Sequence, residues 1–182
     1  DQPESNIFIS PLSVSMALGM TLNGAANQTY DDMKQTLRFG GLTDHEINAA
    51  YQSLIDLLMN LDEDVIFKIA NSIWYRKGFH VEQAFIDTNE HYFDAETASL
   101  DFAGPSAADI INDWVKDKTS GRIDKILDNI PAETVMYLIN AIYFKGTWQY
   151  EFNKDDTKDK PFYPAEGSPF NCRTMSITGK FN

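Results

Sequence analysis

Hydrophobic residues recur at helical spacing through the first part of the chain and predict a series of helices. Ser10-Pro11 marks the first start, because serine can cap the free amides of the first turn and proline is preset for the first helical position. This helix should run to about Gly24. Its side chains are apolar nearly all the way round, which is typical of a helix buried on most sides. A second helix is expected over 27–38.

Thr43 and Glu46 are placed as a capping box and predict the start of a third helix. Beyond it the hydrophobic period changes, because β-branched and aromatic residues become frequent. The following elements are then predicted: a strand over 65–76, a helical core within 79–92, a short strand over 98–102 and a helix over 107–119.

Residues 135–144 are almost entirely apolar and predict a strand that is buried on both faces, at the centre of a large sheet. Asn140 is the strongly polar member of this run, and Asn71 occupies a similar place in the strand over 65–76. A buried amide costs about 1–3 kcal/mol unless it is hydrogen-bonded. Asn140 therefore needs partners, either as a core amide that fixes strand register or as part of a switch.

From Trp148 onward aromatic residues are interleaved with charged ones, a pattern that suits short strands and turns near a surface. Neither a repeat nor a linker interrupts the sequence. We therefore expect a mixed α and β fold in which residues 1–182 belong to a single domain with no internal boundary.

The net charge of -12 would repel phosphate backbones and anionic membranes over most of the surface. No apolar run reaches the roughly 18 residues of a membrane-spanning helix. Nucleic acid and membrane insertion are therefore not expected. Cys172 is the single cysteine, which excludes an internal disulfide and a cysteine-based zinc cluster.

Candidate catalytic and ligand-binding residues do not form a recognisable site. His45, His80 and His91 lie in separate segments without metal-ligand spacing. Ser10 and Ser13 lack the turn that presents a nucleophilic serine, and their place at a helix start is explained by capping. No cofactor motif is present, so we expect neither an enzyme nor a bound cofactor or metal.

Asn27-Gln28-Thr29 matches an acceptor for N-linked glycosylation. Such triplets also occur by chance, and asparagine and threonine are both good helix-capping residues. We favour the capping interpretation and leave glycosylation open.

Several segments resemble motifs of the serpin family, and they occur in the family's order. They comprise 6–13 (a sheet B strand leading into helix B), 70–74 (strand 2 of sheet A), 111–115 with 119–123 (helix F and its exit), 139–148 (strand 3 of sheet A) and 175–181 (start of strand 3 of sheet C). One departure is Arg173-Thr174-Met175, where the family usually has Pro-Met-Met.

The resemblance implies an α+β serpin fold that is only partly present. Helices B to F would pack with strands 1 to 3 of sheet A, one strand of sheet B and the beginning of sheet C. Helix A and the C-terminal half of the domain, which carries the reactive-centre loop, are expected to lie outside this chain. That remaining half of the domain would be a partner of these residues.

The resemblance also implies an inhibitor of serine proteases that acts as a suicide substrate, with a cysteine protease as the alternative target. Ser10, Ser13 and Asn140 match the family's shutter residues, and Trp148 matches the breach tryptophan where loop insertion begins. A non-inhibitory serpin that carries a ligand or acts as a chaperone is the alternative function. The resemblance favours an extracellular or periplasmic location over a cytoplasmic one, without determining it.

Overall fold

The computed structural model describes residues 9–179 of the chain. The strand of sheet B expected within 6–13 therefore lies largely outside the described residues. The chain divides into two compact units, 1–145 and 146–182, and each is described by itself. Whether the two units belong to a single domain, as the sequence predicts, depends on how they pack together, so the single domain stays a prediction.

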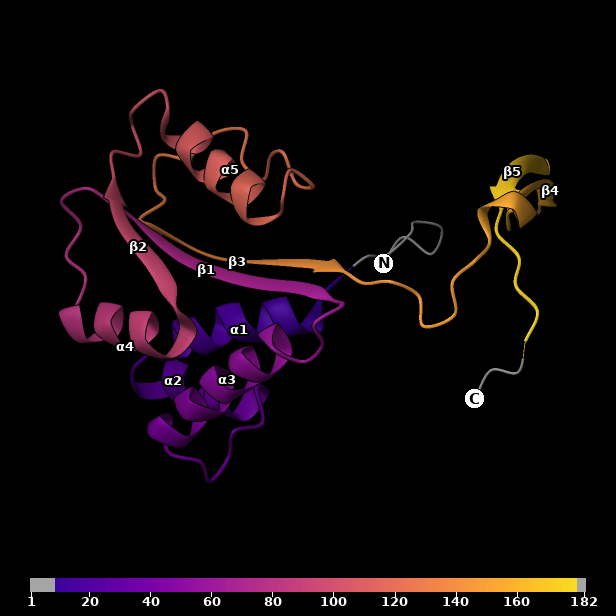
Figure 1. The fold of residues 1–182 in the computed structure, drawn as a ribbon. Coiled ribbons are helices and arrows are strands. Elements are labelled where there is room, and N and C mark those ends of the chain that lie inside the picture. The colour runs from indigo at the N-terminus through magenta and orange to yellow at the C-terminus, as the bar shows by residue number, and fades with distance from the viewer. Residues whose placement is uncertain (1–8, 180–182) are drawn as a thin grey trace. The chain divides into compact units, whose positions relative to one another are not determined.

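The first unit contains the helices and the larger sheet (Figure 1). Its helices are α1 (Pro11–Leu22), α2 (Asn27–Thr36), α3 (Asp44–Met59), α4 (Gln83–Phe93) and α5 (Ala107–Lys118). Its strands are β1 (Ile66–Arg76), β2 (Ala95–Leu100) and β3 (Met136–Lys145). Apart from the sheet B strand within 6–13, the helices and strands predicted in this unit are confirmed, and their boundaries differ by a few residues.

Capping interactions account for the positions at which two of these helices begin. Ser10 Oγ accepts a hydrogen bond from the Ser13 amide at 3.2 Å, with a proline in the first turn of α1. At the start of α3, the Thr43 hydroxyl accepts from the Glu46 amide, and the Glu46 carboxylate accepts from the Thr43 amide at 2.8 Å. Both capping predictions are confirmed.

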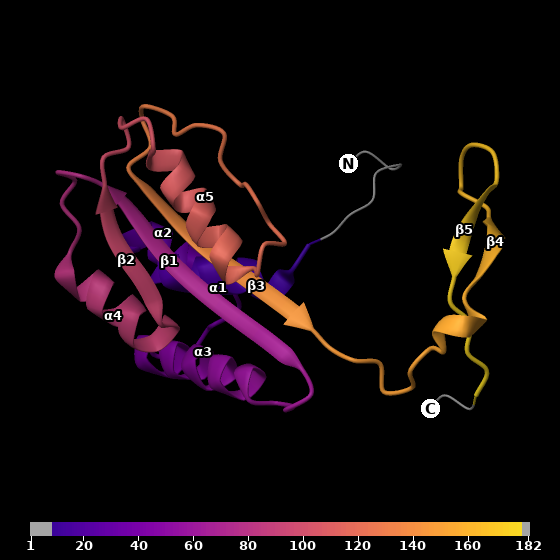
Figure 2. The same cartoon turned by 45° about the horizontal axis from the view of Figure 1, so that its top comes forward.

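The three long strands form one sheet in the order β2-β1-β3. β1 is parallel to β2 and antiparallel to β3, in a register that places Asn71 opposite Asn140. Helices α1 to α3 lie on one side of the sheet and α5 on the other (Figure 1), and the turned view in Figure 2 shows α5 running along the sheet. The sheet is thus the middle of three layers.

Two apolar clusters hold these layers together. The cluster beneath the sheet is built around Met16 and Met20 of α1, Ile73 of β1 and Phe93 of α4. The cluster on the opposite face contains Trp74 of β1, Ile111 of α5 and Phe102, which lies between β2 and α5. Side chains of β1 thus contribute to both clusters.

The expectation that α1 is buried on most sides is wrong for the described residues. Met16 and Met20 are fully buried, but Val14 is 55% exposed and Leu18 is 37% exposed. Helix α1 contacts β3, α2, α3 and α4, and no further element among the described residues covers the face that carries Val14 and Leu18.

The expectation that β3 is a central strand buried on both faces is also wrong for the described chain. β3 is an edge strand of the three-stranded sheet, and most of its residues are half-buried. Ala141 is buried, whereas Phe144 near the strand end is 65% exposed. One long edge of β3 has no strand partner among residues 9–179.

Gly19 allows α1 and α3 to approach closely, which makes its substitution a test of helix packing. A Cβ at this position would lie 2.6 Å from Cε2 of Tyr51, whose hydroxyl donates to the Ser15 carbonyl at 2.8 Å. We expect Gly19→Ala to destabilise the protein by about 1–3 kcal/mol, because the tyrosine must move. Chemical denaturation measures this loss. Gly40→Ala is the control, since nothing lies within 4 Å of its Cβ position, and equal losses in both variants would contradict the packing.

The second unit is a β-hairpin preceded by a short 3₁₀ helix. The 3₁₀ helix covers Lys154–Asp156, and the antiparallel strands are β4 (Lys158–Phe162) and β5 (Phe170–Thr174). The predicted short strands and turns are therefore confirmed. The sequence also predicts a strand within 175–181. β5 ends at Thr174 and residues 175–179 form no strand, while the rest of that range lies outside the described residues.

Candidate functional site

A chain of hydrogen-bonded amides runs from half-buried Asn140 on β3 through buried Asn71 to the end of α4. Asn140 Nδ2 donates to Asn71 Oδ1 at 2.8 Å, and Asn71 Nδ2 donates to the Phe93 carbonyl at 2.7 Å. The antiparallel register places the two asparagines directly opposite each other. Asn71 is only 2% exposed, so its side chain depends on these protein partners rather than on water. Asn140, whose place in an apolar strand predicts a hydrogen-bond partner, therefore has one in Asn71.

Asn140 also reaches α1, through a residue that sequence reasoning did not single out. Its Nδ2 lies 3.5 Å from Met16 Sδ, a weak acceptor in the middle of the helix. The other polar atom of the same side chain, Oδ1, is buried and accepts no hydrogen bond from the described residues. The site thus holds one buried acceptor that is open to a further donor.

Ser10 and Ser13 lie on the same helix as Met16, at its first turn. Their hydrogen bond joins the Ser10 hydroxyl to the Ser13 amide. Within the described chain, the hydrogen bonds of Asn140 run to Asn71 and Met16 rather than to either serine. Helix α1 does contact β3, so the serines belong to an element that lies against the strand. Their shutter role stays a prediction.

A second group of amides, which the sequence analysis missed, ties three helices together. Asn23 Nδ2 at the end of α1 donates to Asn48 of α3 and Asn89 of α4, at 3.1 Å each. Asn89 is fully buried and donates to the Phe85 carbonyl at 2.9 Å. Asparagines within polar or amphipathic helices give no sequence signal of such pairing, because the partners lie far apart along the chain.

The opposite face of the sheet is covered by α5 and the segment that follows it. Asn112 Oδ1 accepts from the amides of Ile126 and Leu127 at 2.8 and 3.0 Å, which folds this segment back on the helix. Arg76 at the end of β1 donates to the carbonyls of Thr134 and Ala132. The segment is therefore anchored at both ends.

Glu96 of β2 ties α5 to the edge of the sheet. Its carboxylate pairs with Lys118 and accepts from Trp114 Nε1 at 2.9 Å. The Lys118 ammonium is the main cause that holds the pKa of Glu96 below its usual value, and the Trp114 bond adds to it. The carboxylate is therefore charged at neutral pH, as this pairing requires.

Trp148 belongs to the second unit and is not part of a strand. β3 ends at Lys145, before the tryptophan expected to terminate it. The Trp148 side chain is 65% exposed and packs edge-on against Phe152, with ring centroids 5.5 Å apart. Its breach role stays a prediction.

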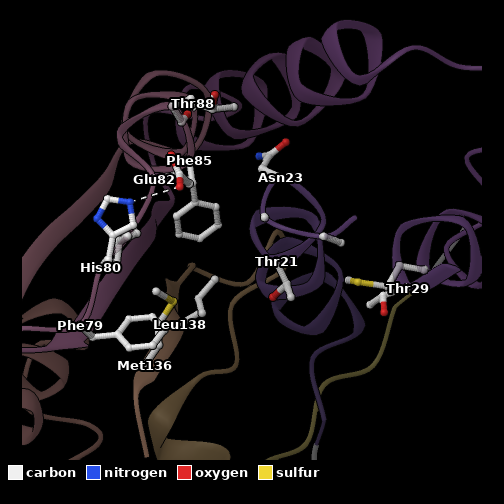
Figure 3. Close-up of a pocket in the computed structure, with 15 residues that line it drawn as sticks. Thr21, Asn23, Thr29, Phe79, His80, Glu82, Phe85, Thr88, Met136 and Leu138 are labelled. Atoms are coloured by element: carbon white, nitrogen blue, oxygen red, sulfur yellow. Dashed lines mark hydrogen bonds and ion pairs between the residues drawn. The ribbon is translucent and has the colours of Figure 1, made fainter. Parts of the chain in front are cut away.

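A cavity of about 560 Å³ lies between the end of α1, α2, the start of α4 and the start of β3 (Figure 3). Its walls are mainly apolar, with Phe79 and Met136 on one side and Phe85 nearer to Thr21. His80 and Glu82 form an exposed pair at 3.2 Å. Among the described residues, no group of three His, Cys, Asp or Glu side chains could hold a metal ion.

A family model described as Serpin (serine protease inhibitor) matches residues 1–182. The chain belongs to the serpin family. Within that family, the leukocyte elastase inhibitor of Sus scrofa is 39% identical over 164 residues, which are 88% of this chain and 43% of the relative. Iripin-2 of Ixodes ricinus is 34% identical and matches 98% of this chain and 46% of its own length. A serpin-like protein of Methanosarcina acetivorans is 31% identical over 97% of this chain and 42% of its own.

Solved serpin structures share the arrangement described above. Cleaved kallistatin superimposes with a TM-score of 0.89 at 25% identity, covering 96% of this chain and 52% of kallistatin. Latent tengpin, a thermophilic serpin, gives 0.85 at 35% identity, covering 94% of this chain and 46% of tengpin. The α+β serpin fold is thus confirmed. This serpin chain spans about half the length of the relatives it matches.

No helix among the described residues of this serpin chain is long and apolar enough to cross a membrane.

Proposed function

We propose that the complete protein inhibits serine proteases as a suicide substrate. The observation that carries the proposal is the edge of β3, which lacks a strand partner in the described chain and has the Asn71–Asn140 pair at its middle. An open strand edge accepts a further strand through main-chain hydrogen bonds. Relatives named leukocyte elastase inhibitor support inhibition of a protease as the function.

The proposed mechanism follows from that edge. A protease attacks the reactive-centre loop, which we expect outside these residues, and forms an acyl-enzyme. The cut loop then enters the sheet beside β3 and draws the protease with it, and the strain stored in the native fold drives the movement. The residues described here supply one wall of the slot (β3), the helix behind it (α1) and the cover over it (α5).

In this proposal Asn140, Ser10 and Ser13 form the shutter that keeps the slot closed. The buried Oδ1 of Asn140 is the acceptor for a donor on the next strand, which the family resemblance identifies as a histidine. A donor there would hold the closed sheet together and would be lost on opening. Trp148 would lie at the breach, where the loop first enters.

A non-inhibitory ligand carrier is the second candidate. The cavity of about 560 Å³ favours it, because its volume lies within the roughly 300–1,000 Å³ of small-molecule sites and its walls are mainly apolar.

Incubation of the complete protein with a panel of serine proteases distinguishes the two functions. We expect a complex that survives denaturing electrophoresis, because the acyl bond is trapped before hydrolysis. A parallel panel of cysteine proteases tests the alternative target class. Cleavage of the protein without a trapped complex, in both panels, would contradict inhibition and favour the carrier.

A further inference from the structure

The start of α2 carries a feature that the switch does not use, and of its three residues only Thr29 lines the cavity. Asn27-Gln28-Thr29 is the single Asn-X-Ser/Thr triplet in the sequence, and its middle residue is not proline. This triplet is the acceptor pattern for N-linked oligosaccharide.

Capping does not account for this triplet. The N-cap of α2 is Ala26, which makes no side-chain capping bond, and Asn27 is the first residue of the helix. No hydrogen bond joins the side chain of Asn27 or the hydroxyl of Thr29 to the described part of the chain, whereas Gln28 donates to Asp32 at 2.8 Å. The capping interpretation preferred from the sequence is therefore wrong here.

Backbone geometry explains only part of the triplet. Asn27 has a φ of 52°, in the left-handed region that asparagine tolerates better than most residues. That conformation accounts for an asparagine or a glycine at this position. It places no demand on Thr29, two residues further along.

Exposure distinguishes the triplet from those asparagines of the first unit that serve as internal hydrogen-bonded amides. Asn27, Gln28 and Thr29 are all exposed. By contrast, the chain uses a set of asparagines as hydrogen-bonded internal amides: Asn23, Asn48, Asn71, Asn89, Asn112 and Asn140. An oligosaccharide on Asn27 would displace no packed side chain and break no hydrogen bond described here.

We propose that Asn27 is an N-glycosylation site. The donor is a lipid-linked oligosaccharide diphosphate. The side-chain nitrogen of Asn27 forms a bond to the anomeric carbon of the sugar, and the bond from that carbon to the diphosphate oxygen breaks. The lipid diphosphate leaves with the electron pair, and the amide nitrogen loses one proton, so no oxidation or reduction occurs.

The test is expression of the complete protein, with a secretion signal, in a eukaryotic host whose secretory pathway supplies this donor. Mass spectrometry of the peptide that contains residue 27, before and after enzymatic release of N-linked sugars, reads out the modification. We expect sugar on Asn27 of the wild type and on Gln28→Ala and Thr29→Ser, which keep the triplet. Asn27→Gln and Thr29→Ala should lose it completely.

Thr29→Ala is the decisive variant, because it keeps Asn27 and its left-handed backbone. Its thermal midpoint after enzymatic removal of sugar should equal that of the wild type treated in the same way. A wild-type peptide without sugar, or sugar that persists in Thr29→Ala, would overturn the proposal. Neither outcome bears on protease inhibition, so the two proposals fail independently.

Discussion

Asn71→Leu in the complete protein is expected to lower the free energy of unfolding by about 2–5 kcal/mol. Asn71 is the middle member of the amide chain, bonded both to Asn140 and to the Phe93 carbonyl. The substitution takes the Asn71 donor from the Phe93 carbonyl and leaves Asn140 Nδ2 with only the weak Met16 Sδ acceptor. Each lost partner costs about 1–3 kcal/mol, and the remaining Met16 contact keeps the sum below twice the upper value. Denaturant unfolding followed by near-ultraviolet circular dichroism measures the change.

Asn129→Leu is the matched control for this prediction. It makes the same chemical change at an exposed position, where substitutions usually stay within about 0.5 kcal/mol. Losses of the same size in both variants would show that the amide chain contributes nothing specific.

Local signals in the sequence were sufficient for the helices. Ser10-Pro11 and the Thr43–Glu46 capping box act on neighbouring backbone amides, so the residues that fix each start lie within one turn. The strand β2 was less well predicted. Its first residues, Ala95 to Thr97, alternate weakly in polarity, and it is parallel pairing with β1 that extends the strand to them.

The candidate site was only half predictable, because its partners are set by register. The sequence showed that Asn140 and Asn71 were polar residues in apolar strands, and each had to be satisfied if buried. That they satisfy each other depends on the antiparallel pairing of β1 with β3, which side-chain periodicity does not encode. The contact between Met16 and Asn140 could not be predicted for another reason, since the sequence does not distinguish a methionine that accepts a hydrogen bond from one that only packs in the core.

Burial was overestimated where a residue's surroundings depend on distant segments. The apolar run of β3 resembles a central strand, yet in the described chain it is an edge. Trp148 resembles a strand terminus, yet it lies exposed in the second unit. The family resemblance supplied the proposed function in both cases, and the residues alone did not.

The second large effect is expected from Asn140→Leu, which loses the bond to Asn71 and, in the proposed closed sheet, also changes the rate of opening. In the proposed closed sheet, Oδ1 of Asn140 accepts from a donor on the next strand. Leucine would leave that donor buried without a partner, which raises the free energy of the closed state by about 1–3 kcal/mol. The open state does not bear this cost, so opening becomes easier.

We expect the complete protein to convert to loop-inserted or polymeric forms about 5–150 times faster than the wild type. This range assumes that the whole rise of about 1–3 kcal/mol in the free energy of the closed state lowers the activation free energy of opening. Native electrophoresis over a time course at elevated temperature records the loss of monomer. Asn89→Leu provides the control. It removes a fully buried amide, but one that ties helices and lies outside the sheet.

The rate of monomer loss for Asn140→Leu and Asn89→Leu, each held at the same interval below its own unfolding midpoint, tests the central claim most directly. This comparison removes the general effect of lost stability and leaves the effect of the sheet amide. The shutter account predicts that Asn140→Leu converts at least about tenfold faster, a ratio that corresponds to about 1.4 kcal/mol. Equal rates would contradict it and would mean that Asn140 only fills space in the core.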